Sequence, residues 1–198
     1  SDGVLSPIVV GIGWAIALPA LAISVRRLQT DQVGTYGAVS AAFFAGSTIH
    51  VPVGPFSMHL VLSGIAGLLL GWGALTIVTV GLLLQALLIG FGGLTVLGVN
   101  ISIMALPGAI MGMIGRHWIK QVSPKKRPWI GSLIGGGTIL ISAILLYVTL
   151  STTNTALMPL AKLVFLGHIP IAIVEGVISF WLVHFLQKVK PSLLGVSL

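Results

Sequence analysis

The chain has 198 residues, of which 56% are hydrophobic and 7% are charged, and its formal net charge is +7. Soluble domains carry about 25% charged residues, so this composition excludes a soluble protein and indicates a single integral membrane domain over residues 1–198. Cysteine is absent, which excludes disulfides and thiolate metal sites. The basic residues lie between apolar segments and do not form a basic face with interleaved aromatics, so the positive charge does not indicate nucleic-acid binding.

Seven mostly apolar segments follow one another along the chain, and a membrane-spanning helix needs about 20 such residues. They lie at 4–25, 34–52, 57–72, 74–91, 99–115, 129–150 and 163–186. The second segment is weakly apolar, which favours contact with protein over contact with lipid, and the third is short for a full crossing. Two later segments contain near-continuous apolar runs, one broken only by Gln85 and the other only by Ser142. The sequence therefore predicts an all-α integral membrane protein, a bundle of about seven transmembrane helices.

The basic residues predict the orientation of this bundle. Nine of the ten Lys and Arg residues follow the first, fifth and seventh segments, which all end on one side of the membrane, and only Lys162 falls on the other side. Loops rich in Lys and Arg stay in the cytoplasm. We therefore expect a multi-pass protein of the cell membrane with its N-terminus outside and its C-terminus in the cytoplasm.

Four polar residues fall at the expected outer boundary. His50 and His59 flank a Pro/Gly turn, Asn100 lies near the start of the fifth segment, and His168 lies near the start of the seventh. Imidazole favours the later divalent transition metals, whereas calcium and magnesium prefer carboxylates, and the chain has only three acidic residues. On the residues alone, each histidine is either a metal ligand or a polar side chain packed at the membrane surface.

Glu175 is the one acidic residue near the middle of an apolar segment, where a carboxylate is costly and usually faces the bundle interior. His168 precedes it by two helical turns, on the same face of the helix but about 10 Å away. We interpret Glu175 as a structural hydrogen-bonding residue or a partner contact, in preference to a transport role.

Three stretches of the chain carry recognisable motifs. Residues 2–7 read Asp-Gly-Val-Leu-Ser-Pro, residues 90–100 read Gly-Phe-Gly-Gly-Leu-Thr-Val-Leu-Gly-Val-Asn after an apolar run, and Glu-Gly-Val-Ile at 175–178 precedes Lys-Pro-Ser-Leu-Leu at 190–194. In this order they resemble the CbiM/NikM family, the cobalt/nickel substrate-binding membrane components of energy-coupling-factor transporters. The resemblance covers nearly the whole chain and agrees with the expected number of spans and their orientation.

The resemblance implies a specific metal site. In the family the chain begins Met-His, and the N-terminal amine, a backbone nitrogen and that imidazole bind the metal in the outer mouth of the bundle. A histidine at the start of the third span completes a nearly square-planar nitrogen site, which suits nickel(II), and it matches His59 here. Asn100 and Ser57 are expected to orient a ligand or the N-terminal segment through hydrogen bonds.

The sequence departs from the family pattern at several positions. It begins at Ser1 without the Met-His pair, so we expect further N-terminal residues that supply ligands. His50 stands where the family often has Asn, which makes it a candidate additional or substitute metal ligand. Met58 stands where Gly is common, and Phe91 where Asp or His is common.

The resemblance implies capture of nickel or cobalt ions at the extracellular face for ATP-driven uptake. The metal is the transported substrate, and no catalytic cofactor or enzymatic activity is implied. The sequence contains no phosphate-binding loop, so uptake would require a transmembrane coupling subunit, a pair of cytoplasmic ABC ATPases and often a small accessory membrane subunit. An ATP-independent metal channel or carrier is the alternative. A membrane enzyme ranks lowest, because catalytic metal sites usually add a carboxylate base or an open water position.

Overall fold

The structure is a computed structural model that describes residues 3–53 and 56–196, with the side chains of residues 50–58 outside this description. Most of the described chain is helical. The helices are α1 (Pro7–Val25), α2 (Val33–Thr48), α3 (Ser63–Leu70), α4 (Gly73–Leu88), α5 (Leu97–Asn100), α6 (Leu106–Gln121), α7 (Arg127–Thr153) and α8 (Met158–Val189). A π-helical segment, η2 (Ile101–Ala105), joins α5 to α6. Short 3-10 turns lie at η1 (Thr30–Gln32), η3 (Thr155–Leu157) and η4 (Pro191–Leu194), and a hairpin comprises β1 (His50–Val53) and β2 (Phe56–His59).

Four helical stretches are long and apolar enough to cross a membrane. They are Pro7–Val25, Leu97–Gln121, Arg127–Thr153 and Thr155–Val189, and α4 is apolar but shorter. Large apolar side chains are exposed on the outward faces of α1, α7 and α8, for example Ile12, Leu133 and Ile173. Water penalises such exposure by about 25 cal/mol for each Å², whereas lipid does not. These faces therefore suit a hydrocarbon environment.

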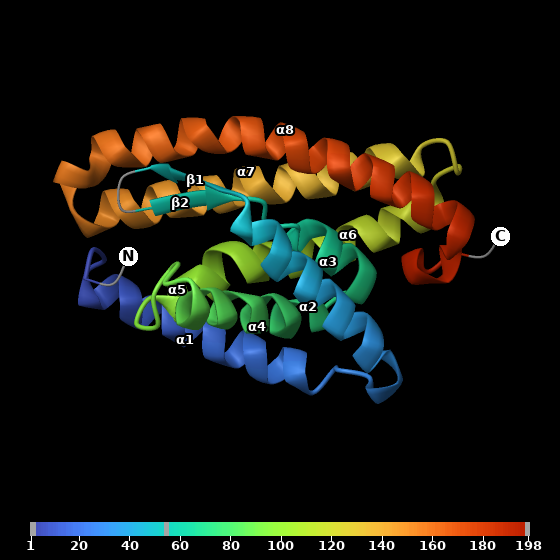
Figure 1. Cartoon of the computed structure of the whole chain (residues 1–198), viewed down its shortest axis with the longest axis horizontal. Helices are drawn as coiled ribbons and strands as arrows, with labels where there is room; N and C mark the ends of the chain where they lie inside the picture. Colours follow the sequence, from blue (N-terminus) through green and yellow to red (C-terminus); the bar gives the residue numbers. More distant parts are fainter. Residues whose placement is uncertain (1–2, 54–55, 197–198) are drawn as a thin grey trace.

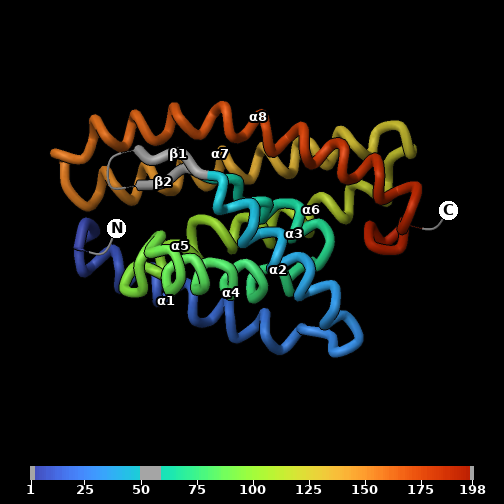
Figure 2. The backbone as a smooth tube through the Cα atoms, viewed as in Figure 1, coloured from blue at the N-terminus to red at the C-terminus, as the bar shows by residue number. Residues whose placement is uncertain are grey.

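The helices form an elongated bundle (Figure 1). α7 and α8 run antiparallel along one side, and α1 lies on the opposite side (Figure 1). α3, α4 and α6 lie between them, as the backbone trace in Figure 2 also shows. The N-terminal residues lie at one end of the bundle and the C-terminal residues at the other.

The second expected span, 34–52, ends as a strand in the structure. Helix α2 stops before residue 50, and β1 pairs antiparallel with β2 so that His50 lies opposite His59. Valine on either side of Pro52 favours an extended backbone, and Pro52 disfavours the helical conformation in the residue before it. The expected helix is therefore confirmed for α2 as far as Thr48, and the prediction is wrong for its last residues, 50–52.

The third expected span, 57–72, is not one helix. Its first residues belong to β2, and only the eight residues of α3 are α-helical before the chain turns into α4. Leu62 (φ 53°) before α3 and Gly71 (φ 58°) after it both adopt positive φ. Residues other than glycine rarely enter this region. These two residues confine α3 to about two turns.

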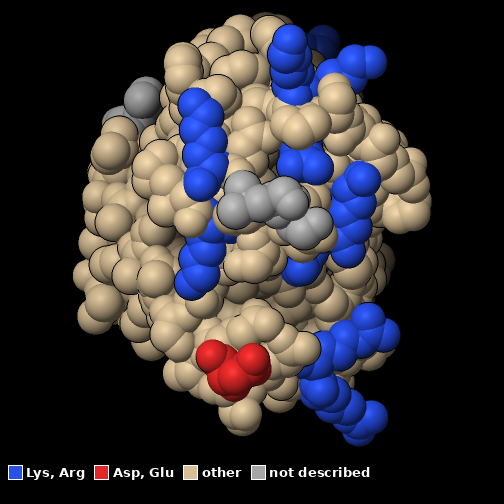
Figure 3. Space-filling view, turned by 90° about the vertical axis from the view of Figure 1, so that its right-hand side faces the viewer, with Lys and Arg blue, Asp and Glu red and all other residues tan. Residues whose placement is uncertain are grey.

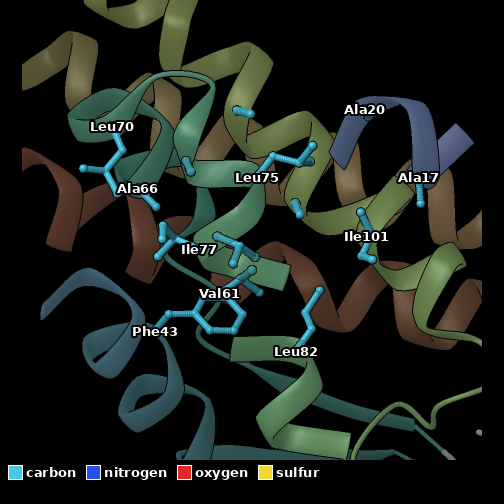
Figure 4. Close-up of a cluster of buried hydrophobic side chains, with 14 of the residues drawn as sticks. Ala17, Ala20, Phe43, Val61, Ala66, Leu70, Leu75, Ile77, Leu82 and Ile101 are labelled. Carbon is cyan, nitrogen blue, oxygen red and sulfur yellow. The ribbon is translucent and has the colours of Figure 1, made fainter. Parts of the chain in front are cut away.

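The hydrophobic core lies where α1, α2, α3 and α4 meet η2. In Figure 4 the Phe43 ring of α2 lies beside Ile77 of α4, whereas Ala17 of α1 lies above Ile101 of η2 at the other side of the cluster, and all four residues are buried. The side chain of Ala17 is small, which lets α1 approach α5 and η2 closely. Burial of this cluster holds the short helices in place between the long ones.

Helices α3 and α6 touch through their backbones. A Cβ atom on Gly67 of α3 would lie 2.0 Å from the Gly108 carbonyl oxygen of α6, and one on Gly112 would lie 2.0 Å from the Gly67 carbonyl carbon. Small residues that allow such close approach are typical of helix contacts in membranes. Glycine at these positions is therefore required by packing.

Lysine and arginine side chains gather at the end of the bundle that carries the C-terminal residues (Figure 3). They come from the segments that follow α1 and α8, from the segment between α6 and α7, and from the adjoining ends of α6, α7 and α8: Arg26, Arg27, Arg116, Lys120, Lys125, Lys126, Arg127, Lys188 and Lys190. Lys162 lies near the start of α8, towards the other end. The charge of the molecule is thus concentrated on one end.

We expect Gly112→Ala to lower the thermal unfolding midpoint of the purified protein in detergent, because the new methyl group must push α3 and α6 apart, and overpacking of this kind costs about 1–3 kcal/mol. Gly137→Ala in α7 is the matched control, since its Cβ atom would meet only the Met111 Cε atom at 3.5 Å. Equal midpoints for the two variants would contradict the backbone contact between α3 and α6.

Candidate functional site

A cavity of about 90 Å³ lies between β2, α4, α5 with η2, α7 and α8. Leu5, from the N-terminal segment, is one of its lining residues, so the cavity lies in the half of the bundle that carries the N-terminus (Figure 1). Most lining side chains are apolar. The polar ones are His59, Gln85, Asn100, Ser142 and His168. The cavity thus joins donor groups that are far apart in the sequence.

His59, the last residue of β2, is half-buried in the wall of this cavity. Its Nδ1 atom lies 3.0 Å from the carbonyl oxygen of Leu60. A carbonyl oxygen only accepts hydrogen bonds, so the Nδ1 atom carries the ring proton and donates. The neutral imidazole therefore bears its lone pair on Nε2, as a metal-ligating histidine held by a backbone carbonyl does.

His168 belongs to α8 and lines the same cavity. Its Nδ1 atom lies 2.7 Å from the Val164 carbonyl oxygen, one helical turn earlier. The same reasoning fixes the ring proton on Nδ1 and the lone pair on Nε2. The cavity is thus lined by two half-buried imidazoles in the same tautomer, one from the hairpin and one from a long helix.

Asn100 ends α5, directly before the π-helical segment η2, and is half-buried at the cavity. Its amide group lies over Gly92, where a Cβ atom would be 2.7 Å from the Asn100 Nδ2 atom. Gly92 also has φ 82°, a conformation that favours glycine. The glycine therefore leaves space for the amide, and π-helical segments of this kind are frequent at functional sites.

Gln85 of α4 and Ser142 of α7 complete the polar lining, and both are more than 90% buried. Within the described part of the chain, the Gln85 Nε2 atom and the Ser142 hydroxyl have no hydrogen-bond partner. Buried polar groups nearly always have one, so a polar occupant of the cavity would satisfy them. Each of the two residues interrupts an apolar run in the sequence. That interruption is the signal that could have identified them as residues of a polar site.

The expected site residues divide into two groups. His59 and Asn100 line one cavity, while the side chains of His50 and Ser57 lie outside the described residues, so their expected roles remain predictions. The backbone of β1 nevertheless places His50 opposite His59 in the hairpin register. His168, which was expected at the outer boundary but is not one of the predicted ligands, lines the same cavity as His59 and Asn100.

The polar groups of the cavity are neutral nitrogen and oxygen donors. None of its lining residues is acidic, and among the side chains that the structure describes, those of residues 3–49 and 59–196, no group of three or more His, Asp or Glu is placed to hold a metal ion. Imidazole nitrogen suits the later transition metals, whereas hard cations need carboxylate oxygens. The donors present therefore fit part of the coordination shell of a transition metal ion.

Comparison with known proteins assigns a family. The family described as CbiM, "Cobalt uptake substrate-specific transmembrane region", matches residues 1–193. A Haemophilus influenzae protein described as "Putative metal transport protein" is 35% identical over 199 residues, covering 98% of this chain and 96% of that one. The "Cobalt transport protein CbiM" of Sorangium cellulosum is 31% identical, covering 94% and 92%. A crystal structure of a transition metal transporter has the same fold, with a TM-score of 0.83 at 23% identity, over 96% of this chain and 92% of the other.

We expect the neutral rings of His59 and His168 to be Nδ1–H tautomers, because each Nδ1 atom donates to a carbonyl oxygen. Nitrogen-15 NMR of histidine-labelled protein distinguishes the tautomers, and His59→Ala and His168→Ala assign the two signals. An Nε2–H signal from either ring in the neutral state would show that its carbonyl contact is not made.

Proposed function

Because the chain belongs to the CbiM family of cobalt uptake substrate-specific transmembrane regions, we propose that it captures nickel or cobalt ions at the extracellular face for ATP-driven uptake by an energy-coupling-factor transporter. It is a multi-pass membrane protein of cobalt and nickel transport. The proposal concerns which residues bind the metal, from which side it enters, and what drives its passage.

The observation that carries the proposal is the cavity that His59 and Asn100 share. The Nε2 lone pair of His59 provides a ligand, and the absence of acidic lining residues disfavours calcium and magnesium. Further ligands would come from the N-terminal segment, whose Leu5 already lines the cavity. A shell composed mainly of nitrogen donors suits nickel(II) and also accepts cobalt(II).

The distribution of charge supports an outward-facing cavity. The Lys and Arg side chains gather at the end of the bundle opposite the N-terminus (Figure 3), and such residues mark the cytoplasmic side. Chain ends at opposite ends of the bundle suit an odd number of crossings. In this orientation the half of the bundle that holds the cavity faces the outside.

ATP-driven uptake assigns the energy supply to other subunits. The chain has no phosphate-binding loop, so the proposal includes a transmembrane coupling subunit, a pair of cytoplasmic ABC ATPases and an accessory membrane subunit. The basic end of the bundle is the face that would lie beside the ATPases. Metal accumulation by cells that express this chain without those subunits would contradict the proposal and favour an ATP-independent channel or carrier.

We predict that His59→Ala weakens nickel or cobalt binding at least about a hundredfold, because it removes a metal ligand. Loss of a residue that only orients a ligand costs about 10–100-fold in affinity, so loss of the ligand itself should cost at least the upper value. Titration calorimetry on the complete encoded chain in detergent measures the change. His117→Ala is the matched control, since His117 is exposed at the basic end and its Nε2 atom contacts Gln121.

The control variant should bind metal as the unaltered protein does, and both variants should keep their unfolding midpoint. Unchanged affinity in His59→Ala would overturn the assignment of this ligand. A loss of affinity in His117→Ala of similar size would show that removal of any imidazole disturbs the protein.

We predict that Asn100→Ala lowers metal affinity about tenfold or changes the preference between nickel and cobalt, because the amide orients a ligand or the N-terminal segment, and such supporting groups contribute about 10–100-fold to affinity. Parallel titrations with both metals measure affinity and preference together. If both stay unchanged, Asn100 has no role in binding.

A pair of glycine variants tests the same role of Asn100 without altering it. Gly90→Ala and Gly92→Ala both place a side chain at positive φ, but only the Cβ atom at residue 92 would reach the Asn100 amide. Gly92→Ala should therefore lower metal affinity more than Gly90→Ala, while both reduce stability. Equal affinities in the two variants would separate metal binding from the position of the amide.

A further inference from the structure

Glu175 is a completely buried carboxylate in the middle of α8. Its Oε1 atom accepts hydrogen bonds from the backbone N–H groups of Val61 and Leu62, the latter at 2.9 Å. These bonds join residues more than 110 positions apart in the chain. Burial of a carboxylate is costly unless it is hydrogen-bonded, so these contacts are strong determinants of the local structure.

The two N–H groups belong to the segment that connects β2 to α3. This segment begins directly after His59 and ends at Leu62, which has φ 53° and precedes the first residue of α3. The left-handed conformation costs a residue with a side chain about 1–2 kcal/mol. Leu62 is the N-cap residue of α3 and its apolar side chain provides no capping hydrogen bond, so the Glu175 carboxylate satisfies the Leu62 N–H group, which has no partner within the helix.

We propose that Glu175 is the positioning residue of His59, acting through the backbone of Val61 and Leu62. Its carboxylate fixes the turn that follows His59 and thereby holds the imidazole at the cavity. Because His168 lies on the same helix two turns earlier and lines the same cavity, α8 would position both imidazoles. This inference rests on the proposed metal-binding function of His59.

Two conservative variants separate the hydrogen-bonding role from a role of the charge. Glu175→Gln keeps the length of the side chain and a carbonyl oxygen that accepts both N–H groups, but it removes the charge. Glu175→Asp keeps the charge but withdraws the carboxylate by one methylene. The positioning role therefore predicts that the glutamine variant binds metal well and the aspartate variant binds it poorly.

The measurement is titration of nickel(II) into each variant of the complete chain in detergent, together with the ligand-field absorption spectrum of the bound metal. We expect Glu175→Gln to stay within about threefold of the unaltered affinity. Glu175→Asp should lose about 10–100-fold, as for other residues that orient metal ligands, with an altered spectrum because the imidazole is displaced. Equal affinity and spectrum for all three proteins, or a weaker glutamine than aspartate variant, would overturn the proposal.

A second substitution distinguishes positioning from general stability. Leu62→Gly makes positive φ accessible without strain, so Glu175→Asp combined with Leu62→Gly should recover at least about threefold of the lost affinity, although glycine removes a partly buried side chain. A double variant that recovers nothing would overturn the proposal, because the turn would then not be what the carboxylate holds.

His59→Ala in the same series separates this inference from the proposed function. If His59→Ala abolishes binding and Glu175→Asp does not weaken it, the positioning role is wrong and the ligand assignment stands. If His59→Ala has no effect on binding, the proposed site itself is wrong, and the positioning role falls with it.

Discussion

The short helix α3 lies in the interior of the protein, and at each of its ends a polar side chain from another helix makes hydrogen bonds to its backbone. At the N-terminal end of α3, Glu175 accepts the N–H groups of Val61 and Leu62. At the other end, the Arg116 guanidinium of α6 donates to the Leu69 carbonyl oxygen at 3.1 Å. The positive Arg116 guanidinium at the C-terminal end also matches the helix dipole. Since backbone polar groups in a membrane must be satisfied internally, the central position of α3 depends on both side chains, and the surrounding helices are arranged about it.

The long helices were predictable from hydropathy, whereas the short buried elements were not. An apolar run such as that of α7 or α8 exceeds the membrane thickness and has one structural solution. The runs at 34–52 and 57–72 are also mostly apolar, the first of them weakly, but hydropathy does not distinguish a spanning helix from a strand followed by a two-turn helix enclosed by protein. The short helix α3 is enclosed because it meets α6 at Gly67 and Gly112, and no local pattern reveals which helices meet.

The candidate site was predictable in part for the same reason. The resemblance to a family identified His59 and Asn100, and the structure places both at one cavity without testing their roles. Gln85 and Ser142 gave a signal of their own, since a polar residue alone in an apolar run must face protein or a cavity. Gln85 and Ser142 line the same cavity as His168 because α4, α7 and α8 pack together. The sequence of one chain does not show which helices pack against each other.

The π-helical segment Ile101–Ala105 separates two parts of one long helix that serve different neighbours. Before it, Asn100 faces the cavity; after it, Gly108 and Gly112 face α3. A π-helical turn accommodates an extra residue, and one residue corresponds to about 100° of rotation in an α-helix. The segment therefore changes the rotational setting of the helix between its two parts. In a regular α-helix with one residue fewer at this point, the Asn100 amide would turn away from the cavity while Gly108 and Gly112 kept their contact with α3.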